Sequence, residues 1–216
     1  MCNELGPVTV FDDDMDEITY EGEFSVKKIY EKQMVDAEIL RFQKFLWKKQ
    51  VPTKVSFLLW AYMHNFIPTL SMLRHRGVEI ALDKCHFCQT EVEDADHIFV
   101  NCKYAYEIWM EFLGAFKMQW VMPDTVQSLF EIWSQCKLRG RCRDIWEVIH
   151  YVIIWHIWQQ RNDRAFGARH KTVSELVLFI KHEVVLWLHE KETFRHILLR
   201  LFCSIGKRFY ILNISV

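Results

Sequence analysis

The sequence predicts a mostly α-helical fold, in which a small helical domain is built around a Cys-Cys-His-Cys (CCHC) zinc knuckle and followed by a helical extension. First, the 216 residues include only 7 Gly and 4 Pro but 15% aromatics, which favours long helices over glycine-rich β-turns. Second, apolar residues recur at helical spacing in several segments. Third, Cys and His residues with metal-ligand spacing lie between two of these segments. The hydrophobic content of 51% is sufficient for a buried core.

In the N-terminal half, apolar spacings of three and four predict one helical segment from Ser25 and another over residues 39–46. Pro52 interrupts this pattern. The clearest helical signal follows, an apolar stripe at positions i, i+3, i+4, i+7 and i+8. The stripe consists of Val55, Leu58, Leu59, Tyr62 and Met63. A short helix is expected over residues 69–76 and ends at Gly77, because glycine readily adopts the left-handed conformation after a helix.

Beyond the cysteine cluster, Cys102 leads directly into a predicted helix with apolar residues at helical spacing. Asp124 and Gln127 have the spacing of a capping pair, so we expect them to open the next helix, which runs through Trp133. A basic loop over residues 137–141 then interrupts the chain.

Two more helices complete the prediction. Residues 144–162 are apolar on nearly every face, so this helix is expected at the centre of the core. Thr172 and Glu175 predict the cap of a last helix through Trp187. The most apolar stretch, residues 148–158, is shorter than the roughly 20 residues that cross a bilayer, so no membrane partner is expected.

We expect four parts in the chain: an acidic, disordered leader (1–23), a zinc-binding domain (24–118), a helical extension packed on it (119–190) and a basic apolar tail (191–216). The first 24 residues carry eight acids and no Lys or Arg, so basic residues outnumber acids by seven in the rest. Such a basic body is compatible with nucleic-acid contact. The N-terminus lacks the features of a secretory signal, which predicts an intracellular protein of the nucleus or cytoplasm.

Three cysteines and one histidine have the spacing of a closed metal site. Cys85-x2-Cys88 directs two sulfurs from one tight turn, and His97-x4-Cys102 supplies the second pair from the start of the following helix. Three thiolates and one imidazole predict one structural Zn²⁺, with no open position for a catalytic water. The alternative interpretation is buried free thiols and a polar core histidine, and His86 is an alternative ligand.

Several short motifs precede this cluster in a particular order: Gly22-x-Phe24-Ser25-Val26-Lys27, Trp47-Lys48, Val51-Pro52-x-Lys54-Val55, Phe57-x2-Trp60, Pro68-Thr69 and Leu73-x2-Arg76-Gly77. Together with the cluster they resemble the zinc-binding domain of plant LINE-type retrotransposon reverse transcriptases. The stretch Trp155-x-Ile157-Trp158-x2-Arg161-Asn162-x-Arg164-x-Phe166 resembles the segment that follows this domain. The resemblance covers about residues 22–166 and assigns the zinc-binding domain to residues 24–118. It implies a domain that helps to engage the nucleic acid of the element.

The basic residues suggest where such a nucleic acid would bind. Between residues 41 and 54 there are five cations and no acid, and two arginines follow on the next helix. The predicted phosphate-contacting residues are Arg41, Lys44, Lys48, Lys49, Lys54, Arg74 and Arg76. A second cluster comprises Lys137, Arg139, Arg141 and Arg143, with Trp120 and Trp146 as unplaced stacking residues. The alternative is that both clusters are solvated faces.

The loop between Cys88 and His97 counts against direct binding by the zinc knuckle. It contains four acids, Glu91, Glu93, Asp94 and Asp96, where knuckles that bind nucleic acid are usually basic. We therefore expect this loop to brace the fold while the 41–54 region contacts RNA or DNA.

These observations lead to one main hypothesis and two rivals. The first is a non-catalytic, retrotransposon-derived zinc-binding protein that binds RNA or single-stranded DNA in a sequence-tolerant way. The second is a domesticated protein–protein interaction module braced by structural zinc, and the third is a fragment without a function of its own. No nucleophile–base pattern or glycine-rich phosphate loop is present, so neither an enzyme nor a small-molecule substrate is expected.

Overall fold

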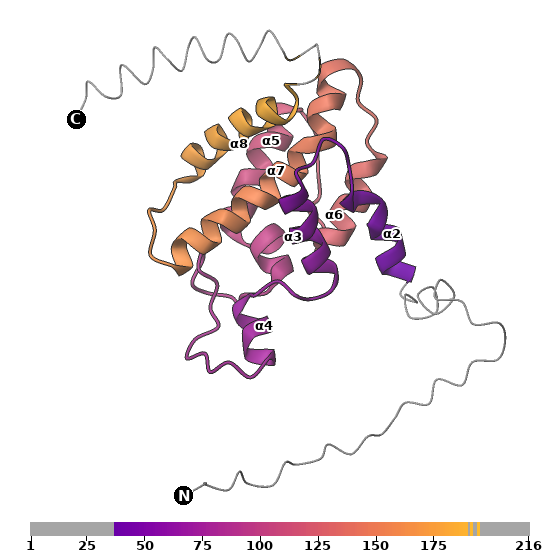
Figure 1. The fold of residues 1–216 in the computed structure, drawn as a ribbon. Coiled ribbons are helices and arrows are strands. Elements are labelled where there is room, and N and C mark those ends of the chain that lie inside the picture. Colours follow the sequence, from indigo (N-terminus) through magenta and orange to yellow (C-terminus); the bar gives the residue numbers. More distant parts are fainter. Residues whose placement is uncertain (1–36, 190, 192–193, 195–216) are drawn as a thin grey trace, which may run out of the picture. The chain divides into compact units, whose positions relative to one another are not determined.

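The computed structural model describes residues 37–189 together with Lys191 and Phe194 (Figure 1). The predicted acidic leader, the predicted helical segment from Ser25 and nearly all of the predicted tail lie outside the described residues. From residue 38 onward, the described residues belong to one unit.

The described residues form helices and no strand, which confirms the mostly helical fold. In chain order the elements are α2 (Ala37–Leu46), α3 (Thr53–Met63), α4 (Leu70–His75), the π-helical turn η1 (His97–Asn101), α5 (Lys103–Ala115), α6 (Val126–Gln135), α7 (Gly140–Ala165) and α8 (Val173–Trp187). None of the described helices has the length and apolar character needed to span a membrane.

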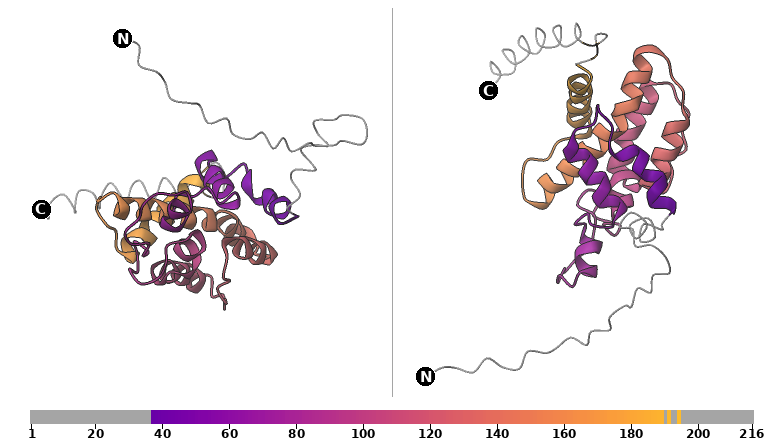
Figure 2. Two further views of the ribbon diagram at one scale, coloured as in Figure 1. Left: turned by 90° about the horizontal axis from the view of Figure 1, so that it is seen from below. Right: turned by 45° about the vertical axis from the view of Figure 1, so that its right-hand side comes forward.

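Helix α7 runs through the middle of the described helices (Figures 1 and 2). It contacts α3, η1, α5 and α8, and residues on several of its sides, among them Val152, Ile153 and Ile157, are fully buried. The prediction of a central helix is therefore confirmed. The helix begins at Gly140, four residues before the predicted start, so the predicted basic loop is partly helical.

Ring contacts join α2 to α6, and hydrogen bonds join α2 to the central helix and to α3. Phe42 and Phe45 of α2 contact the ring of Phe130 at centroid distances of 5.1 and 5.6 Å. The Tyr151 hydroxyl of α7 donates to the Phe45 carbonyl at 2.8 Å, and the Ser56 hydroxyl of α3 donates to the Leu46 carbonyl. One buried cluster includes residues on both sides of the boundary predicted between 118 and 119, and that boundary remains a prediction.

Of three predicted helix ends, two are confirmed and one is wrong. Thr172 and Glu175 form the predicted capping box of α8, and Gly77 after α4 has the expected positive φ of 81°. The cap predicted at Asp124 is wrong, because the hydroxyl of Thr125 accepts the Ser128 N–H at 3.1 Å. Both residue types cap helices well, and Thr125 has the extended backbone that the position requires.

Candidate metal centre

A tight loop presents the first two predicted ligands. The backbone N–H of Cys85 donates to the Glu91 carbonyl at 2.8 Å, and the N–H of Gln89 donates to the Cys85 carbonyl at 2.9 Å. Gln89 has a φ of 59°, the left-handed conformation that reverses the chain. These bonds turn the loop so that the sulfurs of Cys85 and Cys88 point toward one place.

The second pair of ligands flanks the π-helical turn. The N–H of Cys102 donates to the carbonyl of His97 at 2.7 Å, a bond between residues five apart in sequence. This wide turn brings the two residues together, and π-helical turns occur frequently at functional sites. Cys102 then serves as the N-cap residue of α5, so the cluster is continuous with the core.

The four ligand atoms converge with the dimensions of a zinc site. All lie within 4.8 Å of one another. The sulfurs of Cys85 and Cys102 are 3.9 Å apart, and the sulfur of Cys88 is 3.4 Å from Nε2 of His97. Tetrahedral zinc bond lengths require about 3.8 Å between sulfurs and about 3.5 Å between sulfur and nitrogen. A disulfide would need a separation of about 2 Å. The donor set therefore fits zinc.

The surroundings of two cysteines favour the thiolate that a metal binds. The hydrogen bond from the Cys85 thiol lowers the pKa of Cys102, while the same bond and burial raise the pKa of Cys85. For Cys88, burial raises the pKa, but hydrogen bonds from the loop backbone and the Thr90 hydroxyl outweigh it and lower the pKa overall. Thiolates are the form of cysteine that binds metal.

Glu93 joins the cysteine loop to the central helix. Its side chain is fully buried, and its carboxylate accepts hydrogen bonds from Nε and Nη2 of Arg161 at 3.0 and 2.5 Å. It also accepts the backbone N–H of His86 at 3.1 Å and contacts the His86 ring. Burial raises the pKa of Glu93, but these hydrogen bonds outweigh it and lower the pKa overall. Because the His86 ring contacts this carboxylate, it lies outside the ligand cluster.

Two further loop acids also bond within the fold. Oδ1 of Asp96 accepts the Tyr62 hydroxyl of α3 at 2.7 Å and the N–H of Val126 in α6 at 2.8 Å. Oδ1 of Asp94 accepts the N–H of His97 at 2.7 Å. Three of the four loop acids thus hold the loop in place. Sequence reasoning missed these roles, although Asp94 three residues before His97 has the spacing of a helix cap.

The predicted nucleic-acid residues on α2, on α3 and in the loop between these helices have different environments. Lys44, Lys49 and Lys54 are exposed, whereas Lys48 is half-buried with its ammonium 5.7 Å from the centroid of the Tyr151 ring. Arg41 belongs to α2, and its side chain lies outside the described part of the structure.

The two predicted arginines lie at the end of α4 and are both exposed. Arg74 forms an ion pair with Asp83, which leaves it less available to phosphate. The guanidinium of Arg76 lies 5.7 Å from the centroid of the Phe66 ring.

Four exposed aromatic side chains accompany these cations. Trp47, Phe57, Trp60 and Phe66, which we call the aromatic row, have exposed fractions of 60, 55, 38 and 50%. Trp47 contacts Phe57 at 5.5 Å, and Trp60 contacts Phe66 at 5.7 Å between ring centroids. Phe57 and Trp60 are three residues apart on α3, so the two pairs are neighbours. The sequence contained a signal for Phe57 and Trp60, because both are aromatic residues outside the predicted apolar stripe.

The two tryptophans suggested as stacking residues occupy other positions. Trp146 is 3% exposed and stacks on Trp133 with ring centroids 3.9 Å apart. Trp120 is half-buried against both rings. Both differ from the exposed rings of the aromatic row, because each packs against other aromatic rings of the fold.

Fold and site together define a mostly helical domain with a Cys3His metal-binding cluster. The family model described as zinc-binding in reverse transcriptase matches residues 24–109, a stretch that contains all four ligands. This match confirms the resemblance at the level of reverse-transcriptase zinc-binding domains. No curated protein and no solved structure was found to match the chain.

Proposed function

We propose that this chain is a non-catalytic, retrotransposon-derived zinc-binding domain, of the plant LINE type, that binds RNA or single-stranded DNA in a sequence-tolerant way. The family match and the convergence of four ligands support the zinc-binding part. Four protein ligands leave no coordination position for a reacting water, so the single zinc ion serves the structure.

The aromatic row beside unpaired cations is the observation that carries nucleic-acid binding. In the described part of the chain, no carboxylate forms an ion pair with Lys44, Lys49 or Lys54, and α3 itself contains no acid. Proteins bind single strands by combining cations that contact phosphates with aromatic rings that stack on bases. Stacking tolerates any sequence because every base has a π-face.

The zinc loop supports this surface indirectly. Tyr62, on the helix that carries Phe57 and Trp60, donates its hydroxyl to Asp96, which directly precedes the ligand His97. A zinc ion that fixes this loop therefore also fixes the orientation of α3. This arrangement agrees with the predicted bracing role of the acidic loop.

Fluorescence anisotropy with a labelled single-stranded RNA at increasing salt tests the proposal. We expect affinity to fall steeply with salt, because binding releases counterions from the phosphates. The double variant Lys49→Gln/Lys54→Gln is expected to bind more weakly and to reduce the logarithmic salt slope by roughly 0.7 per lost contact. The matched control is Lys103→Gln/Lys181→Gln, which removes two exposed cations from α5 and α8.

The aromatic contribution has its own variant. Trp60→Ala is expected to cost about 1–3 kcal/mol of binding free energy while leaving the salt slope unchanged, because stacking releases no counterions. Binding that is absent or insensitive to salt would contradict the proposal. That result, with a stoichiometric protein partner retained after nuclease treatment, would favour the interaction-module hypothesis.

A further inference from the structure

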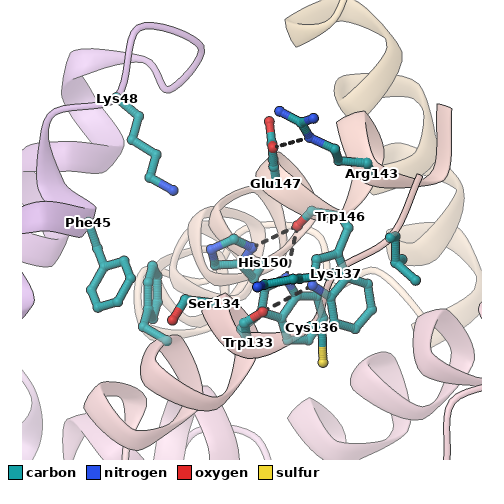
Figure 3. A pocket seen from close by; sticks show the side chains of 12 residues that line it. Phe45, Lys48, Trp133, Ser134, Cys136, Lys137, Arg143, Trp146, Glu147 and His150 are labelled. Atoms are coloured by element: carbon teal, nitrogen blue, oxygen red, sulfur yellow. Dashed lines mark hydrogen bonds and ion pairs between the residues drawn. The ribbon is translucent and has the colours of Figure 1, made fainter. Parts of the chain in front are cut away.

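A cavity of about 430 Å³ lies beside the end of α2 (Figure 3). Its lining comes from α2 and the loop after it, α6, the loop after α6 and the first turns of α7. Its volume is within the range of about 300–1,000 Å³ that small-molecule sites occupy. None of these residues belongs to the zinc cluster, so the cavity is a separate feature.

The inner lining is aromatic and held in place by its own bonds. Trp133 and Trp146 stack with an angle of 10° between their planes. The indole N–H of Trp133 donates to the Trp146 carbonyl at 2.8 Å, and the indole N–H of Trp146 donates to the Trp133 carbonyl at 3.1 Å. Phe45 and Phe130 complete this lining. Because these rings are fixed without a ligand, the cavity is preorganised for a flat apolar group.

One buried histidine presents an acceptor to the cavity. His150 is 3% exposed, and its Nδ1 lies 3.2 Å from the Trp146 carbonyl, which accepts only, so Nδ1 carries the hydrogen. Burial, followed by the charge of Lys48, holds the pKa of His150 well below 6.5, so the ring is neutral and Nε2 is a bare acceptor. Within the described residues Nε2 has no hydrogen-bond partner, and Figure 3 shows it on the side of Phe45 and Lys48.

The mouth of the cavity has a surplus of positive charge. Lys48, Lys137 and Arg143 line it, together with a single carboxylate, Glu147. Glu147 accepts a hydrogen bond from Nε of Arg143 at 2.9 Å. Among the described residues, Lys48 and Lys137 therefore have no carboxylate partner and are available to an anion.

We propose that this cavity binds one nucleotide, with the base against the aromatic lining and the phosphate at Lys48 and Lys137. The base would donate an N–H to Nε2 of His150. Each of the four bases carries at least one N–H donor, so the site does not require a particular sequence. A nucleotide within a single strand and a free nucleoside monophosphate share this chemistry. The first source rests on the proposed function and places one nucleotide of the bound strand beside α2.

The lining contains a hydroxyl and a thiol, yet their contacts indicate binding and not catalysis. The Ser134 hydroxyl donates to the Glu131 carbonyl at 2.7 Å. Within the described part of the chain, neither Ser134 nor Cys136 is hydrogen bonded to His150. A nucleophile needs such contact with its base.

Calorimetry and the indole N–H signals in NMR spectra of the zinc-loaded protein test the proposal, with UMP and AMP as probes. Both nucleotides are expected to bind and to shift the signals of Trp133 and Trp146, whereas uridine and inorganic phosphate bind at least about tenfold more weakly. Lys48→Gln is expected to weaken UMP binding about tenfold through loss of a charge-assisted bond. The control Lys103→Gln, outside the cavity, is expected to leave UMP binding unchanged.

His150→Phe tests the acceptor, and UMP is then expected to bind about tenfold more weakly than to the parent protein. Circular dichroism and zinc content check the fold. If His150→Phe does not fold, Lys48→Gln decides the outcome, because Lys48 is only half-buried and its replacement leaves the core unchanged. The proposal is overturned if neither nucleotide shifts the two indole signals, or if Lys48→Gln protein binds UMP as the parent does.

Competition identifies the source of the nucleotide. Displacement of UMP by a single-stranded RNA assigns the cavity to a strand, and UMP binding without such competition assigns it to a free nucleotide. Each of the two proposals can be contradicted without the other. Salt-dependent RNA binding without UMP binding would exclude the cavity site alone, and UMP binding without RNA binding would exclude the proposed function alone.

Discussion

The carboxylate of Glu93 is removed from water and lies between side chains of two different segments, Arg161 and His86. Arg161 is itself only 4% exposed. A buried charge that loses its partner is strongly destabilising, since no water replaces the lost hydrogen bonds. The packing of the cysteine loop against α7 therefore depends on Glu93. From the sequence alone, this acid is grouped with the other charged residues of the loop.

Glu93→Gln is expected to lower the free energy of unfolding by about 3–5 kcal/mol, because it leaves Arg161 buried without its counter-charge. Urea denaturation followed by circular dichroism measures this. The matched control is Glu91→Gln, an exposed acid of the same loop, which should change stability by less than about 0.5 kcal/mol. Equal effects of the two variants would contradict a structural role specific to Glu93.

Protonation of His156 is expected to cause part of the pH dependence of stability. Burial lowers its pKa to about 4 in the folded protein, and its Nε2 is buried without a hydrogen-bond partner among the described residues. An unfolded histidine has a pKa near 6.5. Between these values only the unfolded chain takes up the proton, so stability is retained above about pH 6.5 and falls as the pH drops toward 4.

Comparison with His156→Phe isolates this contribution. Between pH 7 and pH 5 the parent protein should lose about 1–2 kcal/mol more unfolding free energy than the variant. Protonation of the metal ligands affects both proteins equally and cancels in the difference. Urea titrations at several pH values measure it, and parallel pH profiles of the two proteins would refute the assignment.

Helix α8 shows how local sequence determines the start of an element. The Thr172 hydroxyl accepts the Glu175 N–H at 3.2 Å, and the Glu175 carboxylate accepts the Thr172 N–H at 2.8 Å. These contacts satisfy two N–H groups that have no partner inside the helix. All the groups involved lie within four residues, which is why the capping box was predictable.

Thr172→Ala is expected to destabilise the protein by about 1 kcal/mol through loss of this cap. Ser174→Ala is the matched control, because Ser174 is exposed and lies in the first turn of the same helix. Urea midpoints and amide hydrogen exchange in α8 measure the effect. A cost as large for Ser174→Ala as for Thr172→Ala would show that the cap contributes nothing.

Helix α3 illustrates an element with two apolar sides. The predicted stripe is buried at Val55, Leu58 and Leu59, while Phe57 and Trp60 on the other side are exposed. Periodicity identifies the stripe, but it does not tell whether a second helix covers the remaining aromatic residues. The exposure of the aromatic row, on which the proposed function depends, was decided by packing.

At the scale of the whole molecule, the metal cluster joins the cysteine loop to η1 and to the start of α5, and both of these elements contact the central helix. Structural zinc sites contribute on the order of 10 kcal/mol or more of apparent binding free energy. This is comparable to the total stability of about 5–15 kcal/mol of a typical domain. Metal and fold are therefore expected to be lost together.

Removal of the metal by a chelator is expected to abolish cooperative thermal unfolding and to reduce helix content. Elemental analysis should find one zinc ion per chain in the parent and none in Cys102→Ser. Cys142→Ser, which changes an exposed cysteine outside the cluster, should keep both the metal and the fold. A helical, cooperatively unfolding protein without zinc would contradict the structural role of the site.

The sequence by itself determined the helical class, most helix positions, the capping box and the convergence of Cys85, Cys88, His97 and Cys102. These features depend on spacing over a few residues, on helical periodicity and on metal-ligand chemistry. Only the tertiary structure decided that Glu93 and Asp96 bond inside the fold, that the aromatic row is exposed, and that Lys48 and His150 line one cavity. Burial and exposure follow from which distant helices pack together, and no local pattern contains that information.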